Sequence, residues 1–287
     1  MSTNRQTIGI IGAGTMGRGI AQVAAQSGFE VILHDLSSSA LKDALTGIKE
    51  GLRKSAAKGR ITPTDATEAL SAIRPSRKLN EFGSADFVIE AAVEIMDVKK
   101  DIFRKLDQVV GPETILASNT SSLSINAIAS LTKTPESVVG MHFFNPAPLM
   151  SLVEIIKGKQ TSAETLKRSC DLAMEMKKTP VVCSDTPGFI VNRVARPFYG
   201  EALRLLGEGV ASVAEIDRIV RESGGFRMGP FELMDLIGID INFTVTQSVY
   251  DQFFQEPRFR PHPIQRQMVE SGTLGRKSGR GFYDYRK

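Results

Sequence analysis

A glycine-rich hexapeptide near the start of the chain, GAGTMG at residues 12–17, constrains the fold more than any other feature. The run at 7–11 that precedes it is apolar and rich in β-branched residues, which is typical of a buried strand. After it, Ile20, Val23 and Ala24 repeat at helical spacing until Gly28, which predicts a helix. The pattern G-x-G-x-x-G between a strand and a helix is typical of the turn that binds the pyrophosphate of a dinucleotide.

Each part of this turn has a physical task. The first glycine permits the tight turn, the second lets the backbone approach a pyrophosphate, and the third lets helix and strand pack closely, while the helix N-terminus supplies N–H groups and a positive dipole. An acid follows at the end of the second apolar run, 30–34. We expect it to accept hydrogen bonds from both ribose hydroxyls and to repel a 2′-phosphate, which favours NAD over NADP. The predicted cofactor contacts here are Gly12, Gly14, Thr15, Met16, Gly17 and Asp35.

Strand and helix patterns alternate over the first part of the chain. Helical patterns at 37–58, from 63 onward and at 98–110 alternate with apolar runs that predict strands at 86–92, 114–118, 138–144, 152–156 and 180–183. After the segment DTPG at 185–188, apolar residues recur at helical spacing and hardly any strand pattern follows. We therefore expect a Rossmann-type, mainly parallel α/β domain over residues 1–185 and an all-α C-terminal domain over 186–287.

Composition excludes several other classes of protein. The 287 residues, 41% hydrophobic and 24% charged, are ordinary for about two globular domains. No apolar run approaches the ~18 residues that a membrane-spanning helix needs, and the polar start at 1–6 leads us to expect no signal peptide. A net charge of only +4 and the lack of Trp make nucleic acid an unexpected partner. Two cysteines, Cys170 and Cys183, match no metal or disulfide pattern, so we expect a cytoplasmic protein without a metal.

One of the three histidines stands in a setting that suggests chemistry. His142 ends the apolar run 138–144, where its ring needs hydrogen-bond partners. If this run and 152–156 form an antiparallel hairpin centred on Pro148, Glu154 lies opposite His142 on the same face. A slip of one residue would separate the two side chains, and a purely structural His–Glu pair is the alternative reading. Together with a predicted NAD site, the pair favours acid–base catalysis.

Seven motifs carry a resemblance to a known family. In order along the chain they are GAGTMG at 12–17, SNTSSL at 118–123, GMHFFNPAP at 140–148, LVEII at 152–156, DTPGFIVNR at 185–193, MGPFELMDLIG at 228–238 and GRKSGRGFYDY at 275–285. Together they resemble the L-3-hydroxyacyl-CoA dehydrogenases, most closely the bacterial 3-hydroxybutyryl-CoA dehydrogenases. The resemblance implies NAD as cofactor, an acyl-CoA substrate, and a homodimer formed through the C-terminal domain, which also contacts substrate.

The resemblance also implies roles for single residues. His142 resembles the family's general base, and Glu154 the acid that orients it. Ser121 and Asn192 resemble the groups that hydrogen-bond the reacting oxygen of the substrate. Judged without the resemblance, Ser121 would be part of a helix cap and Asn192 an ordinary helix residue.

Further residues are implied around these. Asn145 resembles a residue that helps to position His142 and the substrate, and Glu94 and Lys99 are similar to residues beside the nicotinamide ribose. A basic stretch that includes Arg53 and Lys54 could bind the phosphates of CoA, although a solvated helix face is the favoured interpretation.

The reaction implied is reversible hydride transfer between NAD and C3 of a (S)-3-hydroxyacyl-CoA, with a short chain such as 3-hydroxybutyryl-CoA expected. Two alternatives stay open at this point. One is a dehydrogenase of a free hydroxy acid, of the L-gulonate type, and the other is a non-catalytic NAD-binding protein.

Overall fold

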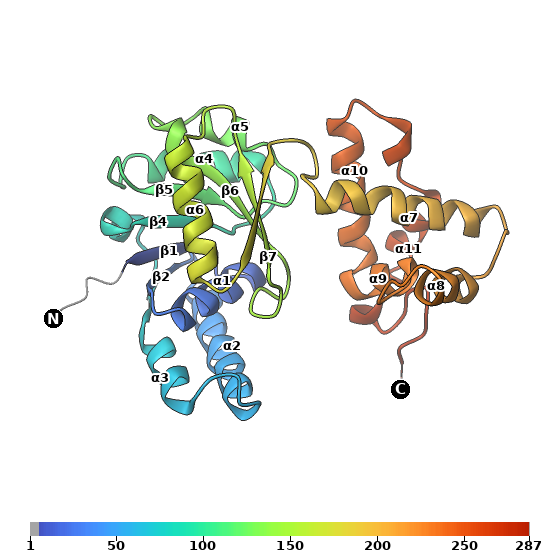
Figure 1. The fold of residues 1–287 in the computed structure, drawn as a ribbon, viewed down its shortest axis with the longest axis horizontal. Coiled ribbons are helices and arrows are strands. Elements are labelled where there is room, and N and C mark those ends of the chain that lie inside the picture. The colour runs from blue at the N-terminus through green and yellow to red at the C-terminus, as the bar shows by residue number, and fades with distance from the viewer. Residues whose placement is uncertain (1–5, 287) are drawn as a thin grey trace. The chain divides into compact units, whose positions relative to one another are not determined.

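The computed structural model describes residues 6–286, which form two compact units (Figure 1). The first unit ends at Thr186 and the second begins at Pro187. Residues 1–5 and 287 lie outside the described part, and they include most of the polar start on which the expectation of no signal peptide rests. None of the described helices combines the length and the apolar character that crossing a membrane requires.

The first unit is built on one eight-stranded sheet. In spatial order its strands are β3 (Ile73–Ser76), β2 (Glu30–His34), β1 (Thr7–Ile11), β4 (Phe87–Glu90), β5 (Ile115–Ser118), β6 (Val138–Phe143), β7 (Leu152–Lys157) and β8 (Thr179–Ser184). Neighbouring strands are parallel except β6 and β7, which are antiparallel. The order 3-2-1-4-5-6 of the parallel part confirms the predicted Rossmann-type fold.

Helices cover this sheet, which explains why its central strands are apolar on both faces. Helices α1 (Thr15–Gln26), α2 (Ser38–Ala57) and α6 (Ala163–Glu175) share one buried apolar cluster with the strands. The remaining helical elements of the unit are α3 (Pro63–Ser71), α4 (Met96–Leu106), α5 (Ile125–Ala129), and the 3₁₀ turns η1 (Leu79–Ser84) and η2 (Pro135–Ser137). The Ser37 and Thr62 side chains cap α2 and α3 by accepting hydrogen bonds from the N–H groups of Ala40 and Asp65.

One strand was not expected from the sequence. β3 contains Arg74 and Pro75, which break the apolar pattern of the other strands. Proline is tolerated at this position because β3 lies at the edge of the sheet, where a missing N–H costs no ladder hydrogen bond.

The described part of the second unit is helical. Its elements are α7 (Val191–Gly207), α8 (Val213–Glu222), α9 (Pro230–Ile237), α10 (Ile239–Gln252), α11 (Pro263–Glu270) and the 3₁₀ turns η3 (Pro257–Phe259) and η4 (Arg276–Ser278). A buried carboxylate, Asp235, ties the end of the chain to this bundle by accepting hydrogen bonds from the N–H groups of Phe282 and Tyr283, both at 3.0 Å. Gly281 is needed beside it, because a Cβ there would lie 2.0 Å from Asp235 Oδ1.

Candidate active site

The glycine-rich turn between β1 and α1 leaves no space for side chains at two of its glycines. Gly12 has φ +99°, and a Cβ there would lie 2.6 Å from the carbonyl oxygen of Ala91. A Cβ on Gly17 would lie 1.7 Å from the carbonyl oxygen of Gly12, so α1 approaches the end of β1 as closely as the predicted pattern requires.

The second glycine of the turn, Gly14, faces open space instead. A Cβ on Gly14 would meet no atom within 4 Å, Gly14 caps α1 without a side-chain hydrogen bond, and the first turn of α1 holds no acid. An anion could therefore approach the positive end of this helix. Asp35, at the end of β2, accepts hydrogen bonds from the N–H groups of Ala13 at 2.8 Å and Ser37 at 2.9 Å. The carboxylate is thus held beside the turn, and the residues present fit the pyrophosphate and a ribose of NAD.

The hairpin of β6 and β7 brings together the predicted acid–base pair. His142 lies directly opposite Glu154 in the antiparallel register, which confirms the predicted pairing. His142 Nδ1 is 2.7 Å from Glu154 Oε2, and the two residues are 6% and 1% exposed. The ring of Phe144 packs against the imidazole with 4.4 Å between centroids. The pair is therefore a short hydrogen bond shielded from water.

The other two histidines have surroundings of a different kind. His34 is buried in β2 against the Phe82 ring, and burial lowers the pKa of its imidazole. His262 caps α11, where its Nδ1 accepts a hydrogen bond from the N–H of Ile264 at 3.3 Å. Among the described histidines, only His142 has a carboxylate within hydrogen-bond distance.

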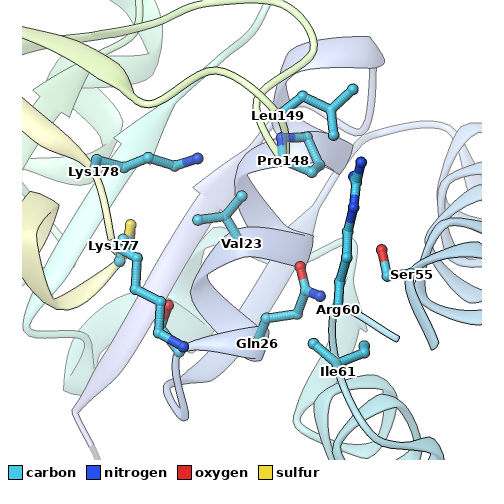
Figure 2. A pocket seen from close by; sticks show the side chains of 11 residues that line it. Val23, Gln26, Ser55, Arg60, Ile61, Pro148, Leu149, Lys177 and Lys178 are labelled. Atoms are coloured by element: carbon cyan, nitrogen blue, oxygen red, sulfur yellow. The ribbon is translucent and has the colours of Figure 1, made fainter. Parts of the chain in front are cut away.

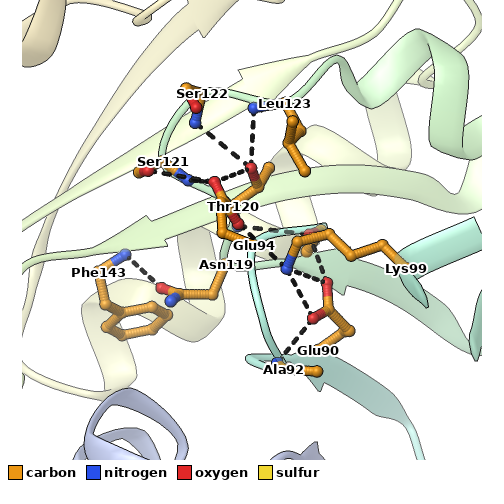
Figure 3. A network of polar contacts seen from close by, with 11 residues as sticks. Glu90, Ala92, Glu94, Lys99, Asn119, Thr120, Ser121, Ser122, Leu123 and Phe143 are labelled. Carbon is orange, nitrogen blue, oxygen red and sulfur yellow. Dashed lines mark hydrogen bonds and ion pairs between the residues drawn. The ribbon is translucent and has the colours of Figure 1, made fainter. Parts of the chain in front are cut away.

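The loop after β5 is held by a single carboxylate, as Figure 3 shows. Glu94 Oε1 accepts hydrogen bonds from the Thr120 hydroxyl at 2.6 Å and from the N–H and hydroxyl of Ser121 at 2.8 and 3.1 Å. Burial favours the neutral acid, but the charge of Lys99 and these hydrogen bonds outweigh it and hold the pKa of Glu94 below its usual value. Two of the predicted site residues, Glu94 and Ser121, are thus in direct contact.

Lys99 occupies a buried position behind this loop (Figure 3). Its Nζ lies 2.7 and 3.0 Å from the two carboxylate oxygens of Glu90 and 3.3 Å from Glu94 Oε2. Lys99 is 1% and Glu90 0% exposed, and Glu90 also accepts from the Ser118 hydroxyl at 2.6 Å. The ammonium group is therefore held between two carboxylates, those of Glu90 and Glu94.

The sequence reasoning missed one residue near His142. Asn119 Oδ1 accepts a hydrogen bond from the N–H of Phe143 at 2.8 Å, which fixes the end of β6 next to the imidazole (Figure 3). Its signal was its place directly after β5, at the carboxyl edge of the sheet where ligands of such folds bind. Asn145, in contrast, is exposed, and no hydrogen bond joins it to His142 within residues 6–286.

Asn192 belongs to the second unit, where it lies in the first turn of α7 and contacts the Arg196 guanidinium.

In the first unit, Arg53 and Lys54 are exposed on α2. Beyond the end of α2 lies a cavity of about 220 Å³ (Figure 2). Arg60 borders it on one side and Lys177 and Lys178 on the other, with α1 between them (Figure 2).

Two family models together match almost the whole described chain. The family model for the NAD-binding domain of 3-hydroxyacyl-CoA dehydrogenase matches residues 7–186, and the model for the C-terminal domain of the same family matches residues 188–285.

Individual relatives are similar over nearly the full length of the chain. A 3-hydroxyadipyl-CoA dehydrogenase of Escherichia coli is 50% identical over 100% of this chain, which spans 60% of that relative. A probable 3-hydroxybutyryl-CoA dehydrogenase of Deinococcus radiodurans is 46% identical, with 96% of this chain and 99% of the relative covered. The crystal structure of a (S)-3-hydroxybutyryl-CoA dehydrogenase from Ralstonia eutropha superposes with a TM-score of 0.94 at 41% identity, over 99% of this chain and 100% of that one.

Both domain models match in order, and relatives that are 41–46% identical are similar over nearly the full length of the chain. The chain therefore belongs to the 3-hydroxyacyl-CoA dehydrogenase family, with NAD as its cofactor.

Proposed function

We propose that the chain catalyses reversible hydride transfer between NAD and C3 of a (S)-3-hydroxyacyl-CoA, giving the 3-oxoacyl-CoA, and that a short acyl chain such as that of 3-hydroxybutyryl-CoA is its substrate. The buried contact between His142 and Glu154 carries this proposal. Neither of the alternatives, a free hydroxy acid dehydrogenase or a non-catalytic NAD-binding protein, has comparable support, because relatives that are 43–50% identical over at least 96% of this chain are named for acyl-CoA substrates.

In the oxidation direction, His142 acts as the base. The Nδ1–H group of the ring donates a hydrogen bond to the Glu154 carboxylate, so the neutral tautomer presents the lone pair of Nε2. Nε2 takes the proton of the C3 hydroxyl, and Glu154 balances the charge of the resulting imidazolium. Bound NAD supplies the hydride acceptor. In reduction the same imidazolium returns the proton to the oxygen at C3.

Ser121 and Asn192 are proposed to bind the oxygen at C3. The Ser121 hydroxyl donates to Glu94, but its N–H donates to the same oxygen atom at 2.8 Å. The hydroxyl can therefore rotate toward a substrate while the backbone keeps the loop in place. We propose that Glu94 lies beside the nicotinamide ribose and that Lys99 supports it from behind. Asn145 is proposed to contact the substrate rather than the imidazole, since it is exposed beyond β6.

Replacement of the base tests the proposal. A positioned acid–base group contributes roughly 10²–10⁴-fold to rate, so His142→Ala should lower kcat by that factor. NAD binding should survive, because the glycine-rich turn and Asp35 lie on β1, α1 and β2. Glu154→Gln is the matched control, since it can keep a hydrogen bond to the ring without the charge. Near-normal turnover of acetoacetyl-CoA by the His142 variant would reject the mechanism.

The CoA part of the substrate is proposed to dock on α2 through Arg53 and Lys54. Both are exposed, and the neighbouring cavity adds Arg60, so positive charge gathers beside this helix. The 3′-phosphate and pyrophosphate of CoA are complementary to it. Charge reversal at positions 53 and 54 should raise KM for acyl-CoA and leave KM for NAD unchanged. An unchanged KM for acyl-CoA would reject this contact.

The acyl part of the substrate can be resolved by a kinetic series. The relatives carry names with different acyl groups, 3-hydroxyadipyl and 3-hydroxybutyryl. Measuring kcat/KM for 3-hydroxybutyryl-CoA, longer homologues and 3-hydroxyadipyl-CoA ranks them directly. A preference for short chains is expected, and a higher kcat/KM for the dicarboxylic substrate would replace that part of the proposal.

We also propose that residues 1–185 form the NAD-binding domain and 186–287 a domain for dimerisation and substrate contact. Exposed apolar side chains in the second unit support a homodimer, among them Val194, Ile219, Phe226 and Ile241, each at least 50% exposed. Light scattering should give twice the mass of the chain. Two free thiols fit the proposed cytoplasmic location, which cell fractionation would test.

A further inference from the structure

Arg196 is a buried cation on the helix that carries Asn192. It lies one turn after Asn192 in α7 and is 4% exposed. Its Nε donates to the carbonyl oxygen of Asn192 at 3.1 Å, and its Nη1 donates to the carbonyl oxygen of Asn242 at 2.9 Å and to the Thr246 hydroxyl at 3.0 Å. The guanidinium also lies 5.1 Å from the ring centre of Tyr199. These contacts hold the group firmly between α7 and α10.

The contacts of this charge described above are with Asn192, Tyr199, Asn242 and Thr246, which are all neutral. Within residues 6–286, no carboxylate lies at ion-pair distance from Arg196. Burial lowers the pKa of the guanidinium to about 10, so it still carries its proton at neutral pH. Because the group is desolvated and has no acid partner, nearby amide and carbonyl dipoles orient their oxygens toward it.

One of these dipoles belongs to the Asn192 side chain. Arg196 Nη2 lies 3.4 Å from Asn192 Oδ1. A guanidinium group has five N–H donors and no acceptor, so only the oxygen of an amide can face it favourably. The two ends of an Asn amide are otherwise hard to tell apart, and here the charge decides between them. The amide NH₂ of Asn192 must then point away from Arg196.

We propose that Arg196 is a positioning residue that holds the Asn192 amide with its oxygen inward and its NH₂ group outward, so that Asn192 acts as a hydrogen-bond donor to the oxygen at C3 of the substrate. This rests on the proposed function, in which Asn192 binds that oxygen. A donor is the useful partner there, since negative charge develops on the oxygen as its proton moves to His142. An acceptor in its place would oppose the reaction.

A double-mutant cycle separates this role from simple packing. Arg196→Met keeps much of the volume but removes the charge, and it should lower kcat about 10-fold, the equivalent of one hydrogen bond of roughly 1.4 kcal/mol. If Arg196 acts through Asn192, the double variant Asn192→Ala/Arg196→Met should be no slower than Asn192→Ala alone. Arg196→Lys should recover most of the loss, because an ammonium group also only donates. Losses in kcat that multiply would overturn the proposal.

Arg193 offers the matched control. It lies on the same helix and stacks over the Phe253 ring at 5.0 Å. Arg193→Met removes the same charge from α7, and its effect on kcat should multiply with that of Asn192→Ala. If Arg193→Met also lost its effect in the Asn192→Ala background, the non-additivity would be general to the helix and the assignment to Arg196 would fail.

Thermal unfolding tests the contact without any substrate. Asn192→Asp places a carboxylate against the guanidinium, so it should raise Tm in the presence of Arg196 and lower Tm in the Arg196→Met background. The same variant lacks the outward NH₂ group and should be as slow as Asn192→Ala. Equal Tm changes in both backgrounds, or wild-type kcat in Asn192→Asp, would overturn the proposal. Absence of 3-hydroxyacyl-CoA turnover in the unmodified protein would instead reject the proposed function, and the Tm comparison would still decide the contact.

Discussion

Replacing Lys99 by Met should destabilise the first unit far more than any exposed ion pair could. The ammonium group is 1% exposed, and its removal leaves the fully buried Glu90 carboxylate with only neutral partners, the Ser118 hydroxyl and the N–H of Ala92. Breaking one side of a buried ion pair typically costs about 3–5 kcal/mol, because the remaining charge is not solvated.

The same helix provides a control with the same contact distance. Lys105 in α4 pairs with Asp101 at 2.7 Å, as Lys99 does with Glu90, but its two side chains are 59% and 55% exposed. Lys105→Met should therefore cost only about 0–1 kcal/mol. Urea unfolding followed by circular dichroism measures both variants. We expect the free energy of unfolding to fall by at least about 2 kcal/mol more for Lys99→Met, and equal losses would refute the role that burial has in this reasoning.

Three further predictions concern other parts of the first unit. The pKa of Glu94 lies below its usual value, so the ionised form stabilises the fold above about pH 4.5. This stabilisation should be lost as the pH falls through the folded-state pKa, which acid unfolding can measure. Gly14→Ala should keep Tm but weaken NAD binding in a titration, whereas Gly17→Ala should lower Tm sharply, because a Cβ has open space at Gly14 and none at Gly17. A lower Tm for Gly14→Ala than for Gly17→Ala, with NAD binding unchanged in Gly14→Ala, would contradict the proposed cofactor site. Burial, together with the charges of Glu154 and Asp185, raises the pKa of the Cys183 thiol to about 12, so iodoacetamide at pH 8 should label it about 10³-fold more slowly than in the unfolded chain.

Much of the fold could be predicted because its signals are local. β1 and β2 begin and end where the apolar runs do, and the turn between β1 and α1 has the expected glycines. The pairing of His142 with Glu154 was also accessible, because a short connection between two strands restricts their register to a few possibilities.

The parts that could not be predicted depend on the burial of residues whose types are usually exposed, and on contacts between distant segments. Lys99 and Arg196 belong to a class that is almost always exposed, so neither pattern nor spacing indicates that they lie inside the protein. Asn119 contacts the backbone of Phe143, 24 residues later, and only the three-dimensional order of β5 and β6 brings them together. Neither the burial of Lys99 and Arg196 nor the contact of Asn119 with Phe143 can be read from the local sequence.

The antiparallel hairpin of β6 and β7 has a consequence for engineering. The proposed base His142 and the proposed orienting acid Glu154 lie on adjacent strands joined by one connection, so their contact forms without any ligand. Substitutions outside β6 and β7, including those in the helical unit, leave the residues that form this contact unchanged. Because the contact lies within a single hairpin, substitutions that change the preferred substrate need not change the proposed proton transfer.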